Sequence, residues 1–243
     1  MSIEKSITFL CGSQRYTIDR YAASSSVKLR PVVIIVHGVD GLGGTSGTQI
    51  AGFAEQIAAE GYIVCVPHYF DVADGSDMLS IEELLVRRVP KVATYAMRIA
   101  AAVDCALTAP DVDDKRLGLI GFSLGGGLAL DYAESAPASK VKAVVDFFGY
   151  LSSPTICLHA SRLPPTLVLH HKEDKVVPLA VSSKLLLDAL GKTKVPHDHW
   201  FYTDINPTGR YHPFAAGGAT DIDSRTRSVA WMKAHVSLAV LSQ

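Results

Sequence analysis

The sequence predicts an α/β fold: a mostly parallel central sheet with helices on both faces and an antiparallel hairpin at its N-terminal edge. Two observations support this class. Apolar runs rich in β-branched residues alternate with segments of helical apolar spacing over most of the 243 residues. A helix between two such strands makes a right-handed crossover, which keeps the strands parallel and places the helices outside the sheet. With 48% hydrophobic and 19% charged residues, the chain can bury a large core, and we expect a single domain over residues 1–243.

The first part of the chain predicts an edge hairpin followed by two core strands. Residues 6–10 and 14–21 alternate in polarity around a short turn, which is typical of paired antiparallel strands. Residues 31–36 form a continuous β-branched run, the pattern of a parallel strand buried on both faces. A helix is predicted over residues 48–60, ended by a glycine, and a further strand over residues 62–66.

The rest of the chain alternates further helices and strands. A helical stripe over residues 86–108 is expected to bend or begin at Pro90, and residues 111–114 form its polar exit loop. The other expected elements are strands over residues 117–120, 141–147, 166–170 and 199–202 and helices over residues 128–136, 178–190 and 224–240. The polar stretch over residues 70–81 is expected to border a pocket mouth, because ligands of such sheets bind at the carboxyl ends of the strands.

The charge balance argues against nucleic acid or an anionic membrane as a partner. Lys and Arg total 23 against 24 Asp and Glu, which gives a formal net charge of −1 without a polybasic run. No apolar run approaches the 18 residues of a membrane span, and the first residues lack the pattern of a secretory signal. We therefore expect a cytoplasmic protein.

The four cysteines are expected to be reduced thiols. Cys11, Cys65, Cys105 and Cys157 match neither a CxxC metal pattern nor a small disulfide scaffold. Cys65 lies in a predicted core strand and Cys105 in a helix of small residues, and both are expected to fill core positions.

The stretch Gly121-Phe122-Ser123-Leu124-Gly125 carries the main functional signal. It follows an apolar strand and opens into a helix, which is the setting of a nucleophile elbow. The glycines fit a turn too sharp for a Cβ atom, and the strained serine would present its hydroxyl to a substrate. A loop of small residues with an incidental serine is the alternative interpretation.

A serine hydroxyl attacks at neutral pH only if a histidine takes its proton and an acid orients that histidine. In this type of sheet the three residues follow in the order serine, acid, histidine. We predict Asp174 as the acid, because it lies in the loop after strand 166–170 and can reach over the sheet edge. Asp146, at the end of strand 141–147, is the alternative, and Glu173 is another; Asp174 could also simply begin the next helix.

His212 is the predicted base. It lies in a loop after the last predicted strand, where an imidazole can reach Ser123. The competing histidines are His68, His170, His171, His197, His199 and His235. Of these, His170 and His171 adjoin the loop of Asp174 and would be hydrogen-bonding neighbours. No two histidines have the HExxH spacing or a similar one, so we expect no metal.

Two backbone N–H groups are predicted to stabilise a tetrahedral oxyanion. In such folds they come from the residue after the nucleophile and from the loop after the first core strand, here Leu124 and Val39. Residues 37–44 are rich in glycine, as a backbone that turns against a substrate requires. They fit neither the P-loop pattern nor GxGxxG, so nucleotide binding is disfavoured.

With these residues assembled, the chain resembles the dienelactone hydrolase family of α/β-hydrolases. The matching motifs, within about residues 31–214, are His37-Gly38-Val39-Asp40-Gly41, the strand from Gly61-Tyr62 to Pro67, Gly121-Phe122-Ser123-Leu124-Gly125-Gly126, Asp174 with Val177-Pro178, and His212 followed by Phe214. The resemblance implies the α/β-hydrolase fold, with Ser123, Asp174 and His212 as nucleophile, acid and base. It also implies Val39 and Leu124 as the oxyanion hole.

The sequence departs from the family pattern at two places. The enzymes that name the family use cysteine at the elbow and a glutamate near the position of Gly38, so this chain fits a plain Ser-His-Asp mechanism better. Those enzymes also hold a carboxylate-bearing lactone through arginines, one of them four residues past the histidine, where this chain has Ala216. Arg87 and Arg88 could supply part of an anion clamp, but a doubly charged helix face is the expected role.

These observations predict a serine hydrolase of small carboxylic esters or lactones that forms an acyl-enzyme intermediate and needs no cofactor. A thioesterase or a small peptidase would use the same residues, because attack and oxyanion stabilisation are shared. A non-catalytic binding module on the same scaffold is the alternative outside enzymology. The sequence leaves the oligomeric state open, since an edge strand is only an opportunity for pairing.

Overall fold

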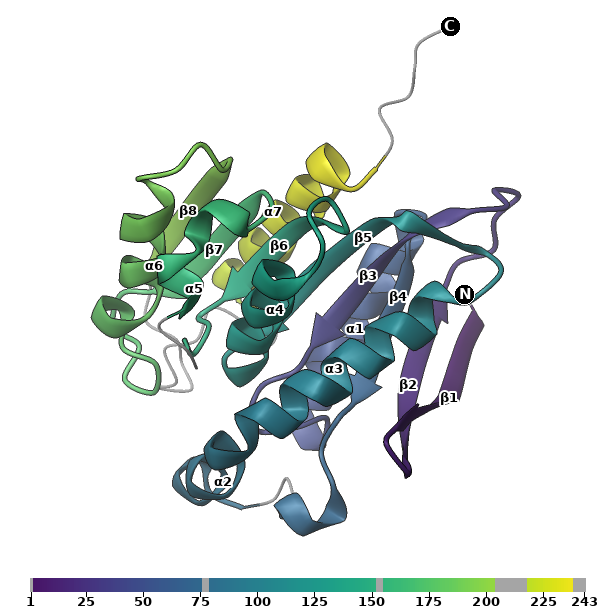
Figure 1. The fold of residues 1–243 in the computed structure, drawn as a ribbon, viewed down its shortest axis with the longest axis horizontal. Coiled ribbons are helices and arrows are strands. Elements are labelled where there is room, and N and C mark those ends of the chain that lie inside the picture. Colours follow the sequence, from purple (N-terminus) through teal and green to yellow (C-terminus); the bar gives the residue numbers. More distant parts are fainter. Residues whose placement is uncertain (1, 76–78, 152–154, 204–217, 238–243) are drawn as a thin grey trace, which may run out of the picture.

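One sheet of eight strands runs through the computed structural model, which describes residues 2–75, 79–151, 155–203 and 218–237 (Figure 1). The strands are β1 (Ser2–Cys11), β2 (Gln14–Ala22), β3 (Arg30–Val36), β4 (Ile63–His68), β5 (Val112–Phe122), β6 (Val141–Phe147), β7 (Thr166–His171) and β8 (His197–Tyr202). Their order across the sheet is β1-β2-β4-β3-β5-β6-β7-β8. Strands β3 to β8 are parallel, whereas β1 and β2 form an antiparallel hairpin at one edge. The predicted fold class is confirmed.

Helices cover both faces of this sheet. They are α1 (Gly44–Ala59), α2 (Ile81–Arg88), α3 (Val92–Leu107), α4 (Leu124–Ser135), α5 (Thr155–Leu158), α6 (Ser183–Leu190) and α7 (Ala219–His235). Side chains of α1 and α7 pack on one face, and those of α2, α3, α4 and α6 pack on the other. The helices therefore lie where right-handed crossovers between parallel strands place them.

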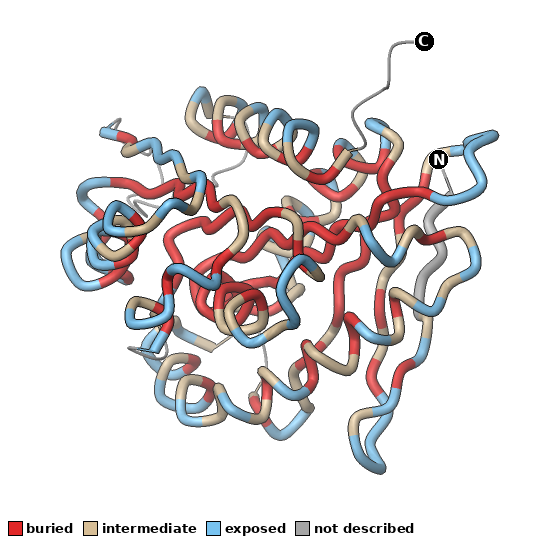
Figure 2. Tube along the Cα trace, turned by 45° about the horizontal axis from the view of Figure 1, so that its top comes forward, coloured by how far each residue is buried: buried red, intermediate tan, exposed pale blue. Residues whose placement is uncertain are grey.

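The alternation of side chains along the central strands produces two cores. In β3, Val32, Ile34 and Val36 point to the face covered by α3 and α4, while Val33 and Ile35 point to the face covered by α1. Every residue of β3 is buried, as its continuous β-branched run predicts. The buried parts of the chain accordingly follow the middle of the sheet, and exposed residues gather in the outer turns (Figure 2).

The polar stretch over residues 111–114 was expected to be a loop, and this expectation is wrong beyond its first residue. Strand β5 begins at Val112, which pairs with Arg30 at the start of β3. The side chains of Arg20 and Arg30 donate to the carboxylate of Asp111, at 2.5 and 2.7 Å from Oδ2. These two cations from distant strands fix the chain just before β5, so that an acidic segment extends the strand.

The helical stripe over residues 86–108 is divided in two, and its first helix begins earlier than predicted. Helix α2 starts at Ile81, where Ser80 and Glu83 form a capping box: the Ser80 Oγ accepts from the Glu83 N–H, and Glu83 Oε2 accepts from the Ser80 N–H. A short 3-10 turn, Val89–Lys91, then leads into α3. The serine and glutamate at this spacing are the sequence signal that would have located the start of α2.

The other predicted elements are confirmed, with ends displaced by a few residues. The predicted helix over residues 178–190 begins as a 3-10 turn, Leu179–Val181, and continues as α6. Helix α7 starts at Ala219 instead of residue 224. None of the described helices has the length and apolarity to cross a bilayer.

Two cysteines occupy the positions expected of them. Cys65 is buried in β4, where desolvation raises the pKa of its thiol to about 12, and Cys105 is half-buried on α3. Both side chains pack with the core on the same face of the sheet. A thiol with such a high pKa is almost wholly protonated at neutral pH, so Cys65 is inert as a nucleophile.

Phe53 should be among the most costly core residues to truncate. Its ring is fully buried on α1 and makes edge contacts with Phe122 and Phe147, at centroid distances of 6.4 and 6.2 Å. We expect Phe53→Ala to lower the free energy of unfolding by about 3–5 kcal/mol in urea titrations, through lost burial and the cavity left behind. Leu10→Ala, at an exposed position of the hairpin, is the control and should change it by less than about 0.5 kcal/mol. Equal effects of the two substitutions would contradict this view of the core.

Candidate active site

Ser123 lies in the sharp turn between strand β5 and helix α4. Its backbone has φ 52° and ψ −116°, a conformation that non-glycine residues rarely adopt. Backbone hydrogen bonds hold the turn: the Ser123 N–H donates to Phe147 O at 2.9 Å, and the Tyr150 N–H donates to Ser123 O at 2.9 Å. Strain of about 1–3 kcal/mol persists at such a residue only where its surroundings fix the geometry.

The glycines around Ser123 are required by contacts between backbones. A Cβ atom on Gly121 would lie 2.6 Å from the Cα of Gly126, and one on Gly125 would lie 2.6 Å from the carbonyl carbon of Val36. Real Cβ atoms do not approach other atoms so closely, so any side chain here would displace α4 from β3 and β5. The turn therefore has the shape that the glycine spacing predicts. A loop of small residues with an incidental serine does not explain these close backbone contacts.

Ser123 opens into a pocket of about 340 Å³ at the carboxyl ends of the strands. The serine is 8% exposed. The lining residues are Leu85, Val86, Val89, Ser123, Leu124, Tyr150, Val176 and Val177. Helix α2 and the turn after it thus form one wall, next to the polar stretch that was expected to border the pocket mouth.

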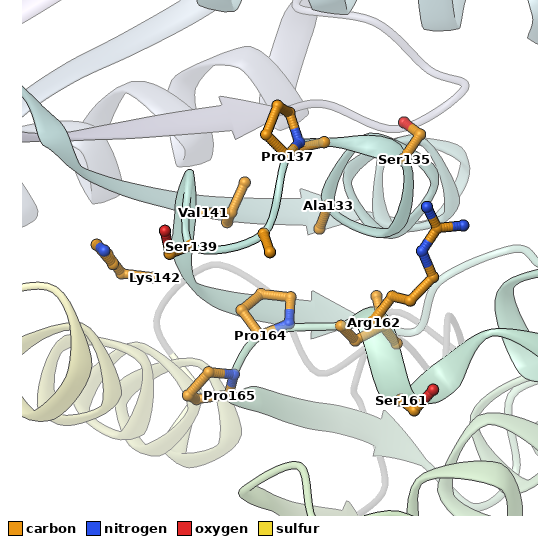
Figure 3. Close-up of a pocket in the computed structure, with 13 residues that line it drawn as sticks. Ala133, Ser135, Pro137, Ser139, Val141, Lys142, Ser161, Arg162, Pro164 and Pro165 are labelled. Carbon is orange, nitrogen blue, oxygen red and sulfur yellow. The ribbon is translucent and has the colours of Figure 1, made fainter.

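A larger hollow, of about 740 Å³, lies at the other end of the sheet (Figure 3). Its lining includes Val141 and Lys142 at the start of β6 and Pro164 and Pro165 just before β7. Because the parallel strands run away from this end, the larger hollow is remote from Ser123. Volume alone would thus select the end of the sheet remote from Ser123.

Asp174 lies in the turn after β7, beside the same pocket. Its Oδ1 accepts hydrogen bonds from the N–H groups of Val176 and Val177, at 2.8 and 2.9 Å. Both valines line the pocket with Ser123. The fold therefore brings the predicted acid's turn and the predicted nucleophile to one place, although they lie 51 positions apart in the sequence.

His170 supports this turn from behind. Its Nε2 lies 2.9 Å from the carbonyl oxygen of Val177, which can only accept, so Nε2 carries the proton. Its Nδ1 then accepts from the hydroxyl of Ser183 at 2.7 Å. The sequence predicted a hydrogen-bonding neighbour of the Asp174 loop, and for His170 this is confirmed.

The loop after β3 packs against the elbow. A Cβ atom on Gly38 would lie 3.5 Å from the Cβ of Ser123 and 2.9 Å from a carboxylate oxygen of Asp40. The ring of His37 stacks on that of Tyr69 at 4.1 Å, and the Tyr69 hydroxyl donates to His37 O at 2.6 Å. Val39, predicted for the oxyanion hole, is buried in this loop. Its predicted partner Leu124 begins α4, where the first N–H groups of a helix have no acceptor within it.

The family model of the dienelactone hydrolase family matches residues 18–239. The chain belongs to the dienelactone hydrolase family. It is 28% identical over 205 residues to a Methylorubrum extorquens protein whose name marks it as a candidate carboxymethylenebutenolidase, covering 77% of this chain and 68% of that protein. It is therefore a hydrolase of the α/β fold, and its substrate is a small molecule.

Solved structures of similar proteins share the fold over nearly the whole chain. One is the dienelactone hydrolase of Anabaena variabilis, with a TM-score of 0.68, 20% identity and coverage of 98% of this chain and 100% of that one. Another is a dienelactone hydrolase-like promiscuous phosphotriesterase from metagenomic libraries, with a TM-score of 0.79, 18% identity and coverage of 97% and 99%. At such identities the likeness concerns the fold alone.

The predicted base, His212, lies outside the described residues. Among the described histidines, His197 and His199 lie on the largely exposed strand β8, and His68 is 3.1 Å from Asp19 at the hairpin side of the sheet. No cluster of three or more His, Cys, Asp or Glu that could hold a metal ion is present in the part of the chain that the structure describes.

Arg88 is buried, which corrects the expectation of a doubly charged helix face. It is 1% exposed, while the adjacent Arg87 is exposed as expected. The Arg88 guanidinium donates to the carbonyl oxygens of Val39 at 2.6 Å, Gly75 at 2.7 Å and Asp74 at 3.3 Å. These acceptors belong to two loops that sequence periodicity could not place beside α2.

Asp146, the alternative acid, lies beneath the elbow and does not line the pocket. Its carboxyl group is fully buried, and a Cβ atom on Gly149 would lie 2.9 Å from its Cγ. Neither carboxyl oxygen has a well-aligned hydrogen bond within the described residues. Burial raises the pKa of Asp146 to about 7, and the backbone N–H of Gly149 opposes this only in part. This buried acid was not expected from the sequence.

Asp146 should make stability fall as the pH rises. The folded protein holds its proton up to about pH 7, whereas the unfolded chain loses it near pH 3.8, so the free energy of unfolding decreases between these values. This decrease in the free energy of unfolding is on the order of 4 kcal/mol. We expect Asp146→Asn, measured by urea unfolding at pH 4 and pH 8, to gain stability relative to the unmodified protein as the pH rises. The exposed Asp198→Asn is the control, and a pH-independent difference for Asp146→Asn would contradict the account.

Proposed function

We propose that this member of the dienelactone hydrolase family hydrolyses carboxylic esters or lactones with Ser123 as nucleophile, His212 as base and Asp174 as acid. The single observation that supports it most is the strained Ser123 turn, whose residue opens into a pocket bordered by the Asp174 turn. Strain at one serine that lines a pocket, on a turn fixed by glycine contacts, is typical of a nucleophile and not of a structural serine.

The reaction would proceed in two steps. His212 takes the proton of the Ser123 hydroxyl as its oxygen attacks the ester carbonyl, and the same imidazole then protonates the departing alkoxide. The N–H groups of Val39 and Leu124 donate to the oxyanion of the tetrahedral intermediate. Water activated by His212 then attacks the acyl-enzyme, the acid leaves, and Ser123 recovers its proton.

The turn that carries Asp174, the proposed acid, supplies two backbone N–H donors to one of its carboxyl oxygens. Two N–H donors on Oδ1 stabilise negative charge on Asp174, while Oδ2 lies on the side of His170, at 3.4 Å from Nε2. An ionised carboxylate is what the mechanism requires, because it orients the imidazole and stabilises the imidazolium that forms during attack.

Ser123→Ala should abolish turnover of p-nitrophenyl butyrate. We expect kcat/KM to fall by about a million-fold, to the background, because the attacking oxygen is gone, with the thermal midpoint of unfolding preserved or raised. Ser139→Ala is a matched control, since Ser139 also has a positive φ, of 69°, but lies by the hollow at the other end of the sheet. Turnover that persists in Ser123→Ala would show that another residue attacks.

Asp174→Asn should lower kcat strongly without loss of folding.

A further inference from the structure

The described residues that line the pocket at Ser123 are all uncharged. The wall of the pocket opposite the Asp174 turn consists of Leu85 and Val86 on α2 and Val89 just after it. Val86 is 76% exposed, so its side chain is accessible to a group bound in the pocket. On the other side, Val176 and Val177 add aliphatic surface, and Tyr150 is the only described lining residue besides Ser123 with a polar side chain. The described lining residues therefore allow an apolar group to be buried and supply no counter-charge.

Arg88, which directly precedes Val89 of this wall, is already engaged. All three nitrogens of Arg88 donate to main-chain carbonyl oxygens, and its guanidinium lies over the ring of Phe70 at 4.0 Å from the centroid. Taking up a substrate carboxylate would require breaking these bonds inside the protein, which leaves buried carbonyl groups without donors. Arg88 therefore holds the loop of Val39 against α2 and does not act as an anion receptor.

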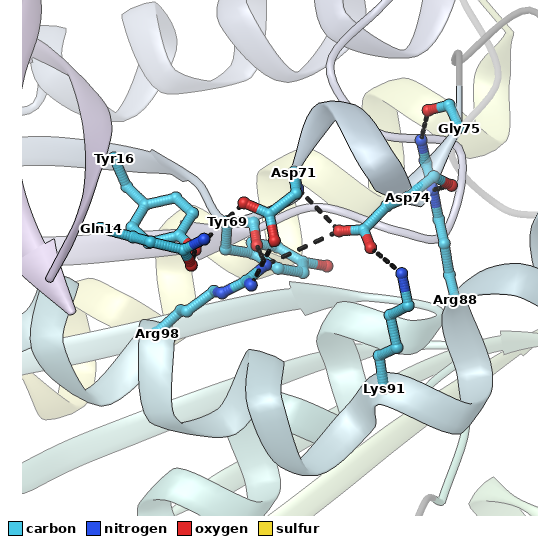
Figure 4. A network of polar contacts seen from close by, with 9 residues as sticks. All are labelled: Gln14, Tyr16, Tyr69, Asp71, Asp74, Gly75, Arg88, Lys91 and Arg98. Carbon is cyan, nitrogen blue, oxygen red and sulfur yellow. Dashed lines mark hydrogen bonds and ion pairs between the residues drawn. The ribbon is translucent and has the colours of Figure 1, made fainter. Parts of the chain in front are cut away.

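The other described cations around α2 are also engaged or point away. Lys91 donates to Asp74 at 2.5 Å, and Arg98 pairs with Asp71 and donates to Tyr69 O at 2.9 Å (Figure 4). Arg87 lies beside Gly75, where an added Cβ atom would come within 3.2 Å of its Cδ, and it does not line the pocket. None of the described residues that line the pocket at Ser123 carries a positive charge.

We propose that the pocket accepts the acyl part of esters whose acid is uncharged and apolar, and that Leu85, Val86 and Val89 determine this preference. The inference rests on the proposed function, because the acyl group is bonded to Ser123 in the acyl-enzyme and must occupy the space around it. The volume of about 340 Å³ is near the lower end for ligand pockets, so the acyl group is of short to medium length.

The test compares two esters of the same shape that differ in charge. The substrates are p-nitrophenyl 6-methylheptanoate and mono-p-nitrophenyl adipate, whose acyl chains end in an isopropyl group and an isosteric carboxylate. We expect kcat/KM to be about 100-fold higher or more for the neutral ester, because the carboxylate would lose its hydration without gaining a partner. Equal or faster turnover of the adipate ester would overturn the inference while leaving the proposed function intact. Absence of turnover with both esters would overturn the proposed function and the inference with it.

A charge placed on the α2 wall should reverse part of this preference. We expect Val86→Lys to lower kcat/KM for the neutral ester and raise it for the adipate ester, so that their ratio changes by about tenfold or more. Val27→Lys makes the same chemical change at another exposed valine, in the connection before β3 at the opposite end of the sheet. Its ratio should match that of the unmodified protein. An equal change in both variants, or none in Val86→Lys, would show that α2 does not contact the acyl group.

Discussion

The positive φ of Ser123 is the constraint on which the site depends. It can persist only because β3, β5 and α4 approach each other at Gly121 and Gly125 more closely than any side chain would allow. The two cores of the sheet supply the packing that holds these backbones together. The stability of the sheet and the geometry of the candidate site therefore depend on each other. Helix α4 can pack on the sheet in this way only if Ser123 is held in this conformation.

The loops around Ser123 are held mainly by side chains that bind main-chain groups. Asp174 receives two N–H groups of its own turn, His170 donates to the carbonyl group of Val177, and Arg88 joins the loops of Val39 and Gly75. Each of these side chains is buried, so each bond is protected from water. As a result, apolar side chains can line the pocket itself while the polar groups that order its loops lie behind it.

Local signals were enough to predict the parallel core, the edge hairpin and the turn at Ser123. The β-branched runs and the paired glycines that indicate these features each lie within a few residues of the sequence. The missed features depend on contacts between distant segments. Strand β5 begins early because Arg20 and Arg30 bind Asp111, and Arg88 is buried because carbonyl groups of two loops surround it. The raised pKa of Asp146 likewise follows from burial beneath α4, which no local pattern indicates.

Chemical labelling of the hydroxyl group tests the central claim most directly. A fluorophosphonate reacts with a serine that a neighbouring base activates, and mass spectrometry of the digested protein locates the adduct. The account predicts one adduct on the folded protein, in the peptide that contains Ser123, and none after denaturation or with Ser123→Ala. An adduct on a different residue of the folded protein, or no adduct at all, would contradict it.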